Sequence, residues 1–440
     1  MDHDDEDYGR PVPAGRLARA ARMGALAGGI GGRALAGGLA RLATGRRPDA
    51  AELLLTPAHA ARIAGQLAGM RGAAMKLGQL ISMDAGEFLP PELTAILARL
   101  REGAEPMPPR QLRAQLDRAW QQGWLSRFDS FAPRPMAAAS IGQVHRARTK
   151  DGRDLAVKVQ YPGVAASIDS DIRNLGLLLR VPGLLPPGLD LPALMEEART
   201  QLRAEADYLR EARQMRAYAA LLADRPEFVL PEPDEALTTP DVLAMSFVPG
   251  EPIEALAGAV QEVRDRAAQD LSRLVLDELF RFNLMQTDPN FANYRWQPDT
   301  GRIVLLDFGA TRSFSEGLAP RYRRLLAAAL DGDRAAIRSA AIAIGYFRED
   351  TAPAHQEALL AMMELAFGPL RQPGRFDLAE TDIPRRITDM TMRLARERSR
   401  AEMPPPEVLF LHRKFGGLYL LLARLRARVD LGALVAPYAG

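Results

Sequence analysis

Phosphoryl transfer from a nucleotide needs a cation on the phosphates, metal ions held by oxygen ligands, and a carboxylate beside the acceptor. The sequence supplies these groups in order along the chain, as Lys158, Asp288, Asn293 and Asp307. Each one alone has an ordinary structural explanation, because lysines on strands are usually solvated and Asp and Asn commonly open or cap turns. Their combination in one order favours a phosphoryl-transfer site.

The spacing of the three acidic and amide residues supports this interpretation. Asp288 and Asn293 are five residues apart in QTDPNFANYR, which is the interval found in the kinase catalytic loop. Asp307 opens Asp-Phe-Gly, fourteen residues after Asn293 and directly after the apolar run Ile303 to Leu306. A carboxylate at the end of a buried strand is costly unless it is paired or metal-bound. We therefore expect Asp288 and Lys158 to be catalytic, and Asn293 and Asp307 to hold Mg²⁺.

Further residues have the types expected around bound ATP. Lys158 lies in the strand-like segment AVKVQ, where side chains alternate between faces. Small residues of an Ala-rich loop let backbone N–H groups approach a phosphate. The segment from Met245 to Val248 has the position of an interlobe hinge, where an adenine edge is read, although it also fits a buried strand end. The candidate nucleotide-binding residues are Ala137, Ala138, Ala139, Ser140, Lys158, Glu211, Met245, Phe247 and Val248.

Composition excludes several other classes of function. The 57 Lys and Arg nearly balance the 55 Asp and Glu, so the net charge of +2 gives no global field for nucleic acid. The absence of cysteine excludes disulfides, thiolate metal sites and a cysteine nucleophile. The five histidines are scattered without metal-ligand spacing, so no zinc site is expected.

The order of predicted elements indicates an α+β, two-lobed arrangement with a helical N-terminal extension. Residues 1–48 form a leader, 49–132 the extension, 133–250 a smaller lobe and 251–440 a helical lobe. A β-hairpin is predicted around the turn Lys150-Asp151-Gly152, with helices at about 165–180 and 191–222. Residues 418–430 are expected to form an amphipathic or packed helix that does not span a membrane.

The leader is basic and rich in Gly and Ala, without acidic residues between Arg16 and Pro48. On a helical wheel its arginines gather on one side and its leucines lie opposite, as in a helix lying on anionic lipid. Its many glycines also fit a flexible segment without regular structure. Its uncharged runs are too short to cross a bilayer, and no secretory signal precedes it.

Several motifs together resemble the UbiB/AarF family of atypical kinases, over about residues 60–425. They are Lys76-Leu77-Gly78-Gln79 (the KxGQ motif), AAASIGQVH, Glu205-Ala206-Asp207, MQTDPNFAN and LLDFGATR. Other branches carry a His-rich catalytic loop, whereas QTDPNFAN is similar to the branch that supports coenzyme Q. The resemblance implies a protein-kinase-like fold, and regulatory roles for Lys76, Gln79, Glu205 and Asp207. It pairs Glu205 with Lys76 and Glu211 with Lys158.

The resemblance also implies a function and a place in the cell. The extension would block phosphorylation of other proteins, while Mg-ATP is hydrolysed in support of ubiquinone biosynthesis. The expected partners are ATP, ubiquinone-precursor lipids, an anionic membrane surface and ubiquinone-biosynthesis enzymes, with a homodimer left open. The expected location is cytoplasmic, peripheral to the inner membrane. Two alternatives remain open: a conventional kinase for a protein or small molecule, and a nucleotide-regulated scaffold without enzymatic activity.

Overall fold

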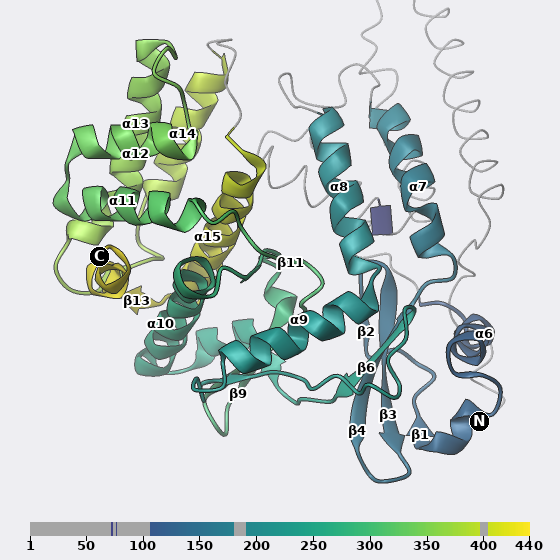
Figure 1. The fold of residues 1–440 in the computed structure, drawn as a ribbon. Coiled ribbons are helices and arrows are strands. Elements are labelled where there is room, and N and C mark those ends of the chain that lie inside the picture. The colour runs from purple at the N-terminus through teal and green to yellow at the C-terminus, as the bar shows by residue number, and fades with distance from the viewer. Residues whose placement is uncertain (1–71, 74–75, 77–105, 180–190, 397–403) are drawn as a thin grey trace, which may run out of the picture. The chain divides into compact units, whose positions relative to one another are not determined.

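The computed structural model describes residues 72–73, 76, 106–179, 191–396 and 404–440 (Figure 1). These residues form two compact units. The N-terminal unit comprises the described chain up to Arg213 together with Glu232–Phe247, and the C-terminal unit comprises Gln214–Pro231 and the described chain from Val248 onward. The basic leader, residues 1–48, lies outside the described residues.

An antiparallel sheet forms the centre of the N-terminal unit, with strands in the order β1-β3-β4-β6 and β2 paired to β3 (Figure 1). The strands are β1 (Phe128–Phe131), β2 (Ala137–Ala138), β3 (Gly142–Thr149), β4 (Asp154–Gln160) and β6 (Val242–Ser246). The predicted hairpin is confirmed as β3 and β4, in the register His145 to Val157. Its turn contains Gly152 at φ +90°, a left-handed conformation that glycine adopts without strain.

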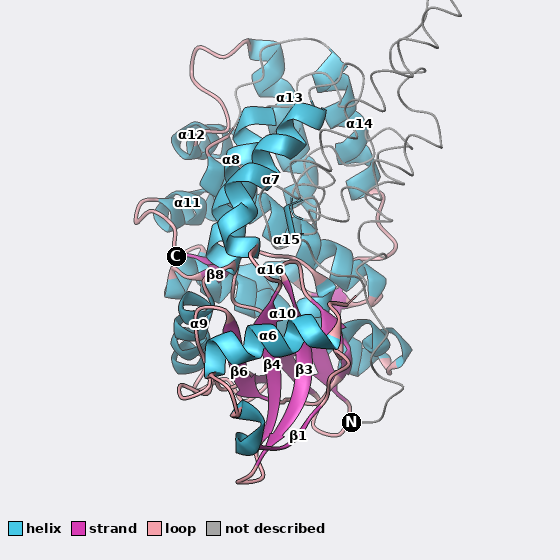
Figure 2. Ribbon diagram, turned by 90° about the vertical axis from the view of Figure 1, so that its right-hand side faces the viewer, coloured by secondary structure: helices cyan, strands magenta, loops and turns pink. Residues whose placement is uncertain are grey.

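Helix α6 (Pro109–Trp120) lies across this sheet (Figure 2). Pro109 suits the first helical position, where the missing N–H has no intrahelical partner to lose. Trp120 ends the helix and donates its indole N–H to the Leu237 carbonyl at 2.8 Å. Its ring stacks on Phe128 with centroids 5.4 Å apart, so an aromatic cluster fastens the helix to the edge of the sheet.

Three further helices follow β4: α7 (Val164–Leu179), α8 (Leu191–Glu205) and α9 (Tyr208–Leu221). Helices α7 and α8 pack side by side (Figure 1), and a Cβ at Gly176 would overlap the Met195 side chain. The prediction of one helix over 191–222 is wrong, because the chain breaks between α8 and α9. At the break Gln160 donates to the Ala206 carbonyl at 2.8 Å, and Asp207 accepts the Arg210 backbone N–H at 2.8 Å. These two bonds replace helical ones.

The C-terminal unit combines short strands with helices. Its strands are β5 (Phe228–Val229), β7 (Glu251–Pro252), β8 (Met285–Gln286), β9 (Tyr294–Gln297), β10 (Arg302–Leu305), β11 (Thr311–Arg312), β12 (Phe376–Asp377) and β13 (Arg428–Val429). They form a sheet in the order β5-β10-β9-β7 and the separate pairs β8-β11 and β12-β13. All pairs are antiparallel except β5 with β10.

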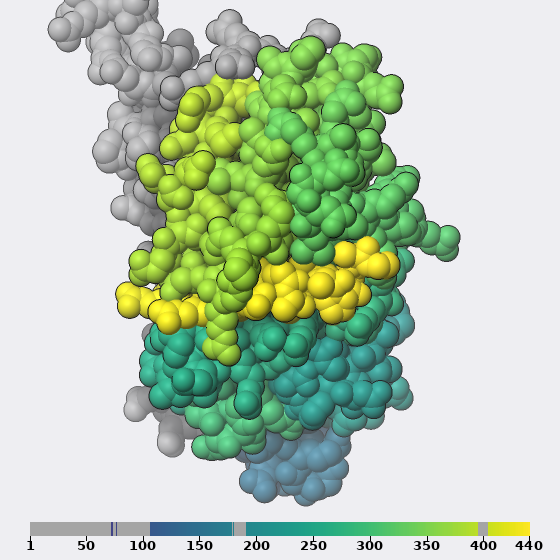
Figure 3. Space-filling view, turned by 90° about the vertical axis from the view of Figure 1, so that its left-hand side faces the viewer, coloured from purple at the N-terminus to yellow at the C-terminus, as the bar shows by residue number. Residues whose placement is uncertain are grey.

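The helices of this unit are α10 (Gln261–Asp277), α11 (Leu318–Asp331), α12 (Arg334–Ile344), α13 (Pro353–Phe367), α14 (Ile383–Arg396), α15 (Pro406–Arg424) and α16 (Leu431–Val435). A π-helical turn over Glu278–Phe282 continues α10. Figure 3 shows the C-terminal residues in yellow, packed against the rest of the unit, where the Tyr438 hydroxyl donates to Asp277 at 2.7 Å. None of the helices in the described ranges is long and apolar enough to cross a bilayer.

The expectation of one helix over residues 418–430 is wrong in its second half. Helix α15 ends at Arg424, and Arg426 takes the left-handed conformation at φ +50°. The chain then enters β13, where Asp265 of α10 accepts the Arg428 backbone N–H at 2.7 Å. The helix thus ends where the backbone gains a tertiary hydrogen bond to α10.

Candidate active site

Lys158 is a buried, paired lysine of the N-terminal unit. It lies in the middle of β4, opposite Val144 on β3 and Leu243 on β6. Its Nζ is 3.0 Å from both carboxylate oxygens of Glu211, in the first turn of α9. The two side chains are only 9% and 1% exposed. A buried charge must be paired and hydrogen-bonded to be tolerated, so this ion pair fixes the position of the ammonium group.

The surroundings of the pair restrain it further. The Tyr208 ring is fully buried and its centroid lies 5.2 Å from Lys158 Nζ, which adds a cation–π contact. Glu211 belongs to the first turn of α9, where the helix dipole favours a carboxylate. The pairing of Lys158 with Glu211 that the resemblance implied is therefore present. The phosphate-binding role of Lys158 stays a prediction.

The Ala-rich loop joins β2 to β3 as a tight turn. Ala137 and Ala138 are exposed on β2, and the Ala139 backbone N–H donates to the Gly142 carbonyl at 2.9 Å. A Cβ at Gly142 would overlap the Val159 carbonyl oxygen, so the close approach of β3 and β4 requires glycine there. The loop therefore presents its backbone among small side chains, the alanine methyl groups and the Ser140 hydroxymethyl group, which suits close approach of a phosphate.

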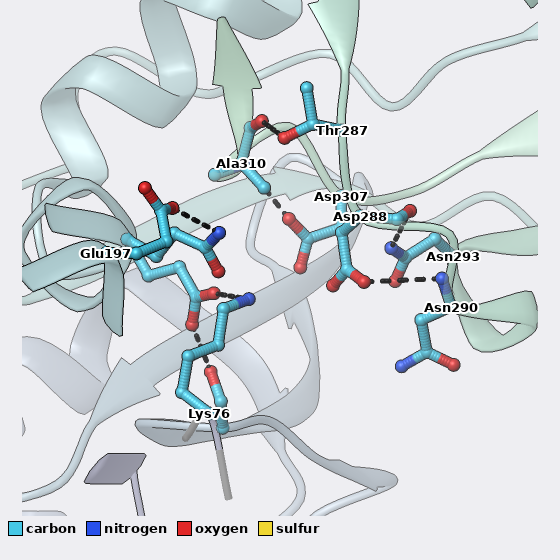
Figure 4. Close-up of polar contacts among 12 residues, drawn as sticks. Lys76, Glu197, Thr287, Asp288, Asn290, Asn293, Asp307 and Ala310 are labelled. Carbon is cyan, nitrogen blue, oxygen red and sulfur yellow. Dashed lines mark hydrogen bonds and ion pairs between the residues drawn. The ribbon is translucent and has the colours of Figure 1, made fainter. Parts of the chain in front are cut away.

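The KxGQ lysine reaches this loop through a shared carboxylate. Lys76 is buried and forms an ion pair with Glu205 at the end of α8 (Figure 4), and the Ser140 hydroxyl donates to the same carboxylate. A Cβ at Gly72 would lie 2.7 Å from the Ile141 side chain, so the backbone of the extension passes close to the loop. The expected pair of Lys76 and Glu205 is present, whereas Gln79 lies outside the described residues.

Asp207, expected to be regulatory, lies at the start of α9. Its carboxylate accepts the Arg210 backbone N–H and lies 3.9 Å from Arg213. These contacts are those of an exposed N-cap residue. They hold the first turn of α9 in place and, with it, Glu211.

The predicted hinge segment lies at the end of β6. Met245 is buried in that strand, and the Phe247 backbone N–H donates to the Asp154 carbonyl at 2.9 Å. The Phe247 ring receives the Arg146 guanidinium 3.9 Å from its centroid. The boundary between the two units falls between Phe247 and Val248. Adenine binding by this segment stays a prediction.

The β9–β10 hairpin places Asn293 and Asp307 at one end of the C-terminal unit's sheet. Tyr294 at the start of β9 is in register with Leu305 at the end of β10. The next rung is the bond from the Leu306 backbone N–H to the Asn293 carbonyl at 3.0 Å. Asp307 follows directly, and one of its oxygens accepts the Gly309 backbone N–H at 2.9 Å. Residues fourteen apart in sequence are thus brought together by the hairpin.

Asp288 lies on the loop between β8 and β9 (Figure 4). Its Oδ1 lies 3.3 Å from the Asn290 backbone nitrogen, and the Asn293 amide nitrogen lies 3.5 Å from its carbonyl oxygen. Just before it, the Thr287 hydroxyl donates to the Ala310 carbonyl at 2.7 Å, beside the β8–β11 pairing. The loop is therefore fixed to both segments that flank Asp307.

The phenylalanine of Asp-Phe-Gly anchors the same region. Phe308 is 1% exposed, and its ring centroid lies 5.0 Å from that of Tyr218, on the second half of α9. Buried aromatic pairs of this geometry stabilise beyond their burial alone. This packing restrains Phe308 and, with it, the backbone of the adjacent Asp307.

The donor groups of this unit fit Mg²⁺. Mg²⁺ prefers hard oxygen ligands and is usually bound by one or two carboxylates together with substrate phosphates and water. Asp307 offers a carboxylate and Asn293 an amide oxygen, adjacent across the hairpin. The described residues contain no cluster of three acidic or histidine side chains that would form an all-protein metal cage. One carboxylate and one amide oxygen are donors that suit a Mg²⁺ ion completed by phosphate oxygens and water.

The chain also matches a known protein family. Residues 99–341 match the family described as the ABC1 atypical kinase-like domain, which is more than half of the chain. The chain belongs to the ABC1 atypical kinase family. The match includes Lys158, Glu211, Asp288, Asn293 and Asp307.

Relatives in this family resemble nearly the whole chain. The atypical kinase COQ8, mitochondrial, of Saccharomyces cerevisiae is 39% identical over 428 residues, covering 96% of this chain and 84% of the yeast protein. The atypical kinase COQ8B, mitochondrial, of Rattus norvegicus is 38% identical, with 97% and 80% covered. Among solved structures, Rv3197 of Mycobacterium tuberculosis, in complex with erythromycin, is similar with a TM-score of 0.62 and 26% identity, covering 85% of this chain and 95% of that one. The α+β, kinase-like fold is thereby confirmed.

One part of this ABC1 kinase's candidate site was missed from the sequence. Lys414, Glu278 and Tyr294 form a buried polar cluster beside the Asp288 loop. The available signal was a single lysine within the largely apolar stretch from Val408 to Leu422. Such a lysine predicts either a solvated face or a buried ion pair, and only the structure decides between them.

Proposed function

We propose that this ABC1 kinase is a Mg-ATP-dependent ATPase or lipid-directed atypical kinase that supports ubiquinone biosynthesis at the membrane. The observation that carries the proposal is the buried pair of Lys158 and Glu211. Lys158 lies in a strand of the N-terminal unit, and two 3.0 Å contacts join its ammonium group to one carboxylate. Such a buried pair has a desolvation penalty that can exceed its contribution to stability. The lysine is well suited to binding the phosphates of a nucleotide.

In this proposal each residue has one role. Lys158 binds the phosphates, with the Ala-rich loop from Ala137 to Ser140 around them, and the segment from Met245 to Val248 binds the adenine. Asp288 orients the attacking hydroxyl or water. Asn293 and Asp307 hold Mg²⁺, which neutralises negative charge on the transferred phosphoryl group. Because such catalysis depends on positioning and electrostatics, the hydrogen bonds around these residues contribute directly to the rate.

We further propose that the extension excludes protein acceptors from the phosphates. Lys76 and Ser140 share the Glu205 carboxylate, so the extension and the Ala-rich loop are held by the same group. An acceptor protein would have to displace a buried ion pair to reach a phosphate bound by that loop. Water or a small acceptor would not.

The lipid part of the proposal rests on the family and on the leader. The yeast and rat relatives carry COQ8 names, which supports a role in coenzyme Q biosynthesis. The arginines between Arg16 and Arg47 would attract an anionic membrane surface, at about 1 kcal/mol per basic residue near the surface. The expected partners are ubiquinone-precursor lipids and enzymes of that pathway, at the inner membrane.

Phosphate release from Mg-ATP tests the proposal. It is measured with and without anionic liposomes containing a phenolic ubiquinone-precursor mimic, for the wild type and for Asp307→Asn. The matched control is Asp299→Asn, which alters an exposed carboxylate in the turn of the same hairpin. Lipid-stimulated release that persists in Asp299→Asn and is lost in Asp307→Asn is the expected result. ATP binding without release would favour a nucleotide-regulated scaffold, and absence of binding would overturn the site.

A further inference from the structure

Helix α15 packs directly under the loop that carries Asp288. Its residue Lys414 is 2% exposed, although lysine is among the residues least often buried. Lys414 is about 120 residues away in sequence from that loop, and the family match at residues 99–341 ends well before it. The burial of this charge therefore needs an explanation of its own.

The Lys414 ammonium group connects both ends of the loop. Its Nζ lies 3.0 Å from the Gln286 side-chain oxygen and 2.9 Å from the Tyr294 hydroxyl. Gln286 is two residues before Asp288, and Tyr294 directly follows Asn293. Its third partner is Glu278, with Oε2 at 3.6 Å. The first two contacts are hydrogen bonds, and the longer contact to Glu278 is an ion pair.

Glu278 is itself tied to the same loop. Its Oε1 accepts the Gln286 backbone N–H at 3.3 Å and lies 2.9 Å from the Tyr218 hydroxyl. Burial raises the pKa of Glu278, and the Lys414 charge acts against that shift. For Lys414, burial lowers the pKa, but the Glu278 charge and the Tyr294 hydroxyl outweigh it and hold the pKa above its ordinary value. The lysine therefore stays charged and keeps its three donors.

One turn further along α15, Gly417 meets the loop itself. A Cβ at Gly417 would overlap the side chain of Pro289, the residue after Asp288. The neighbouring Gly416 is exposed, and a Cβ there would meet no atom within 4 Å. Glycine at position 417 therefore allows α15 to approach the Asp288 loop this closely.

We propose that Lys414 and Gly417 are positioning residues for the catalytic loop, through which α15 fixes Asp288 and Asn293 for phosphoryl transfer. The inference rests on the proposed function for the roles of Asp288 and Asn293. A displacement of the loop by about 1 Å is enough to lower a rate by about 100-fold. A helix outside the matched kinase domain is in this way part of the catalytic apparatus.

The test compares Gly417→Ala with Gly416→Ala in the full chain. Both changes replace glycine by alanine in the same helix, so the gain in helix propensity is matched, and only one of them meets Pro289. Amide hydrogen exchange is followed by mass spectrometry for peptides that contain Thr287 and Asn293, whose backbone N–H groups are hydrogen-bonded. The turnover number and KM for Mg-ATP are measured in parallel. A second variant, Lys414→Met with Glu278→Gln, removes both buried charges together.

We expect Gly417→Ala to speed exchange in the loop on the order of ten-fold, while α11 and α12 keep their protection. The turnover number should fall by about 100-fold with KM nearly unchanged, and Gly416→Ala should match the wild type. The double variant should reproduce both effects. Unchanged loop exchange in Gly417→Ala and in the double variant overturns the inference, as does equally faster exchange throughout the C-terminal unit. If Gly417→Ala speeds exchange in the loop but the wild-type protein hydrolyses no ATP, the positioning of the loop by α15 is supported and the proposed function is overturned.

Discussion

The backbone nitrogen of Leu306 lies 3.0 Å from the carbonyl oxygen of Asn293. This single rung joins the residue before Asp307 to the residue expected to share its metal ion. Because the rung continues the β9–β10 ladder, the spacing of the two ligands is set by strand register and not by loop conformation. A site built on paired strands is more precise than one built on a free loop.

The first prediction concerns this pair of metal ligands. Asn293→Ala removes the amide oxygen and leaves the hairpin backbone intact. The half-saturating Mg²⁺ concentration for phosphate release should rise by about ten-fold or more, because removing one neutral ligand weakens a site that has few protein ligands. A Mg²⁺ titration at fixed ATP measures this. Thr300→Ala, in the exposed turn of the same hairpin, is the control, and equal Mg²⁺ requirements in both variants would contradict the assignment.

The second prediction concerns the stability of the Lys158–Glu211 pair. Lys158→Met leaves Glu211 buried without its cation and should destabilise the N-terminal unit by about 3–5 kcal/mol. Adding Glu211→Leu should restore most of that stability, since replacing both charges is often neutral. Neither variant should release phosphate from ATP.

Urea unfolding followed by tryptophan fluorescence measures this effect. In a Trp296→Phe background the remaining indoles, Trp120 and Trp124, both lie in the N-terminal unit. Lys150→Met, at the exposed β3–β4 turn, is the control, and should change stability by less than about 1 kcal/mol. A double variant that is no more stable than Lys158→Met would show that the pair is not the source of the loss.

Local pattern was enough to predict some parts of the fold and site. The β3–β4 hairpin followed from alternating residues around Lys150-Asp151-Gly152, because those turn residues favour a tight reversal. Asp288, Asn293 and Asp307 were found through their spacing, which the β9–β10 hairpin now explains. Both cases depend on neighbours within about twenty residues along the chain.

The features that the sequence did not predict depend on contacts between residues far apart in the chain. The break between α8 and α9 contains neither Pro nor Gly, and depends on Gln160 taking the Ala206 carbonyl. The end of α15 depends on Gln261 of α10, whose amide donates to the Arg426 carbonyl at 3.0 Å. Lys414 likewise finds its partners more than 100 residues earlier. Periodicity carries no information about such partners.

The third prediction is a pH dependence of the N-terminal unit. His145 is buried, its ring stacked on Phe131, and burial lowers its pKa to about 4 despite the hydrogen bond to the Ala132 carbonyl. The unfolded chain has the ordinary pKa of about 6.5 and so binds more protons as the pH falls below that value. The free energy of unfolding should therefore decrease on acidification between these two pKa values, by about 2 kcal/mol at pH 5.

The same tryptophan signal, recorded between pH 7 and pH 5, measures the slope. His145→Gln keeps hydrogen-bonding groups but cannot be protonated, so the difference in slope between it and the wild type isolates the histidine. Identical pH dependences for the two proteins would mean that His145 does not carry this effect.

The fourth prediction concerns the extension. Lys76→Ala removes the cation that shares Glu205 with the Ser140 hydroxyl, and so loosens the link between extension and Ala-rich loop. We expect autophosphorylation from labelled Mg-ATP to increase, because acceptor side chains gain access to the phosphates. Lys76→Arg keeps the charge and should stay close to the wild type. Since a buried Glu205 without a cation also costs stability, thermal unfolding is recorded beside each assay. Autophosphorylation that is unchanged in a folded Lys76→Ala protein would argue that the extension does not limit access, and would return a conventional kinase activity to consideration.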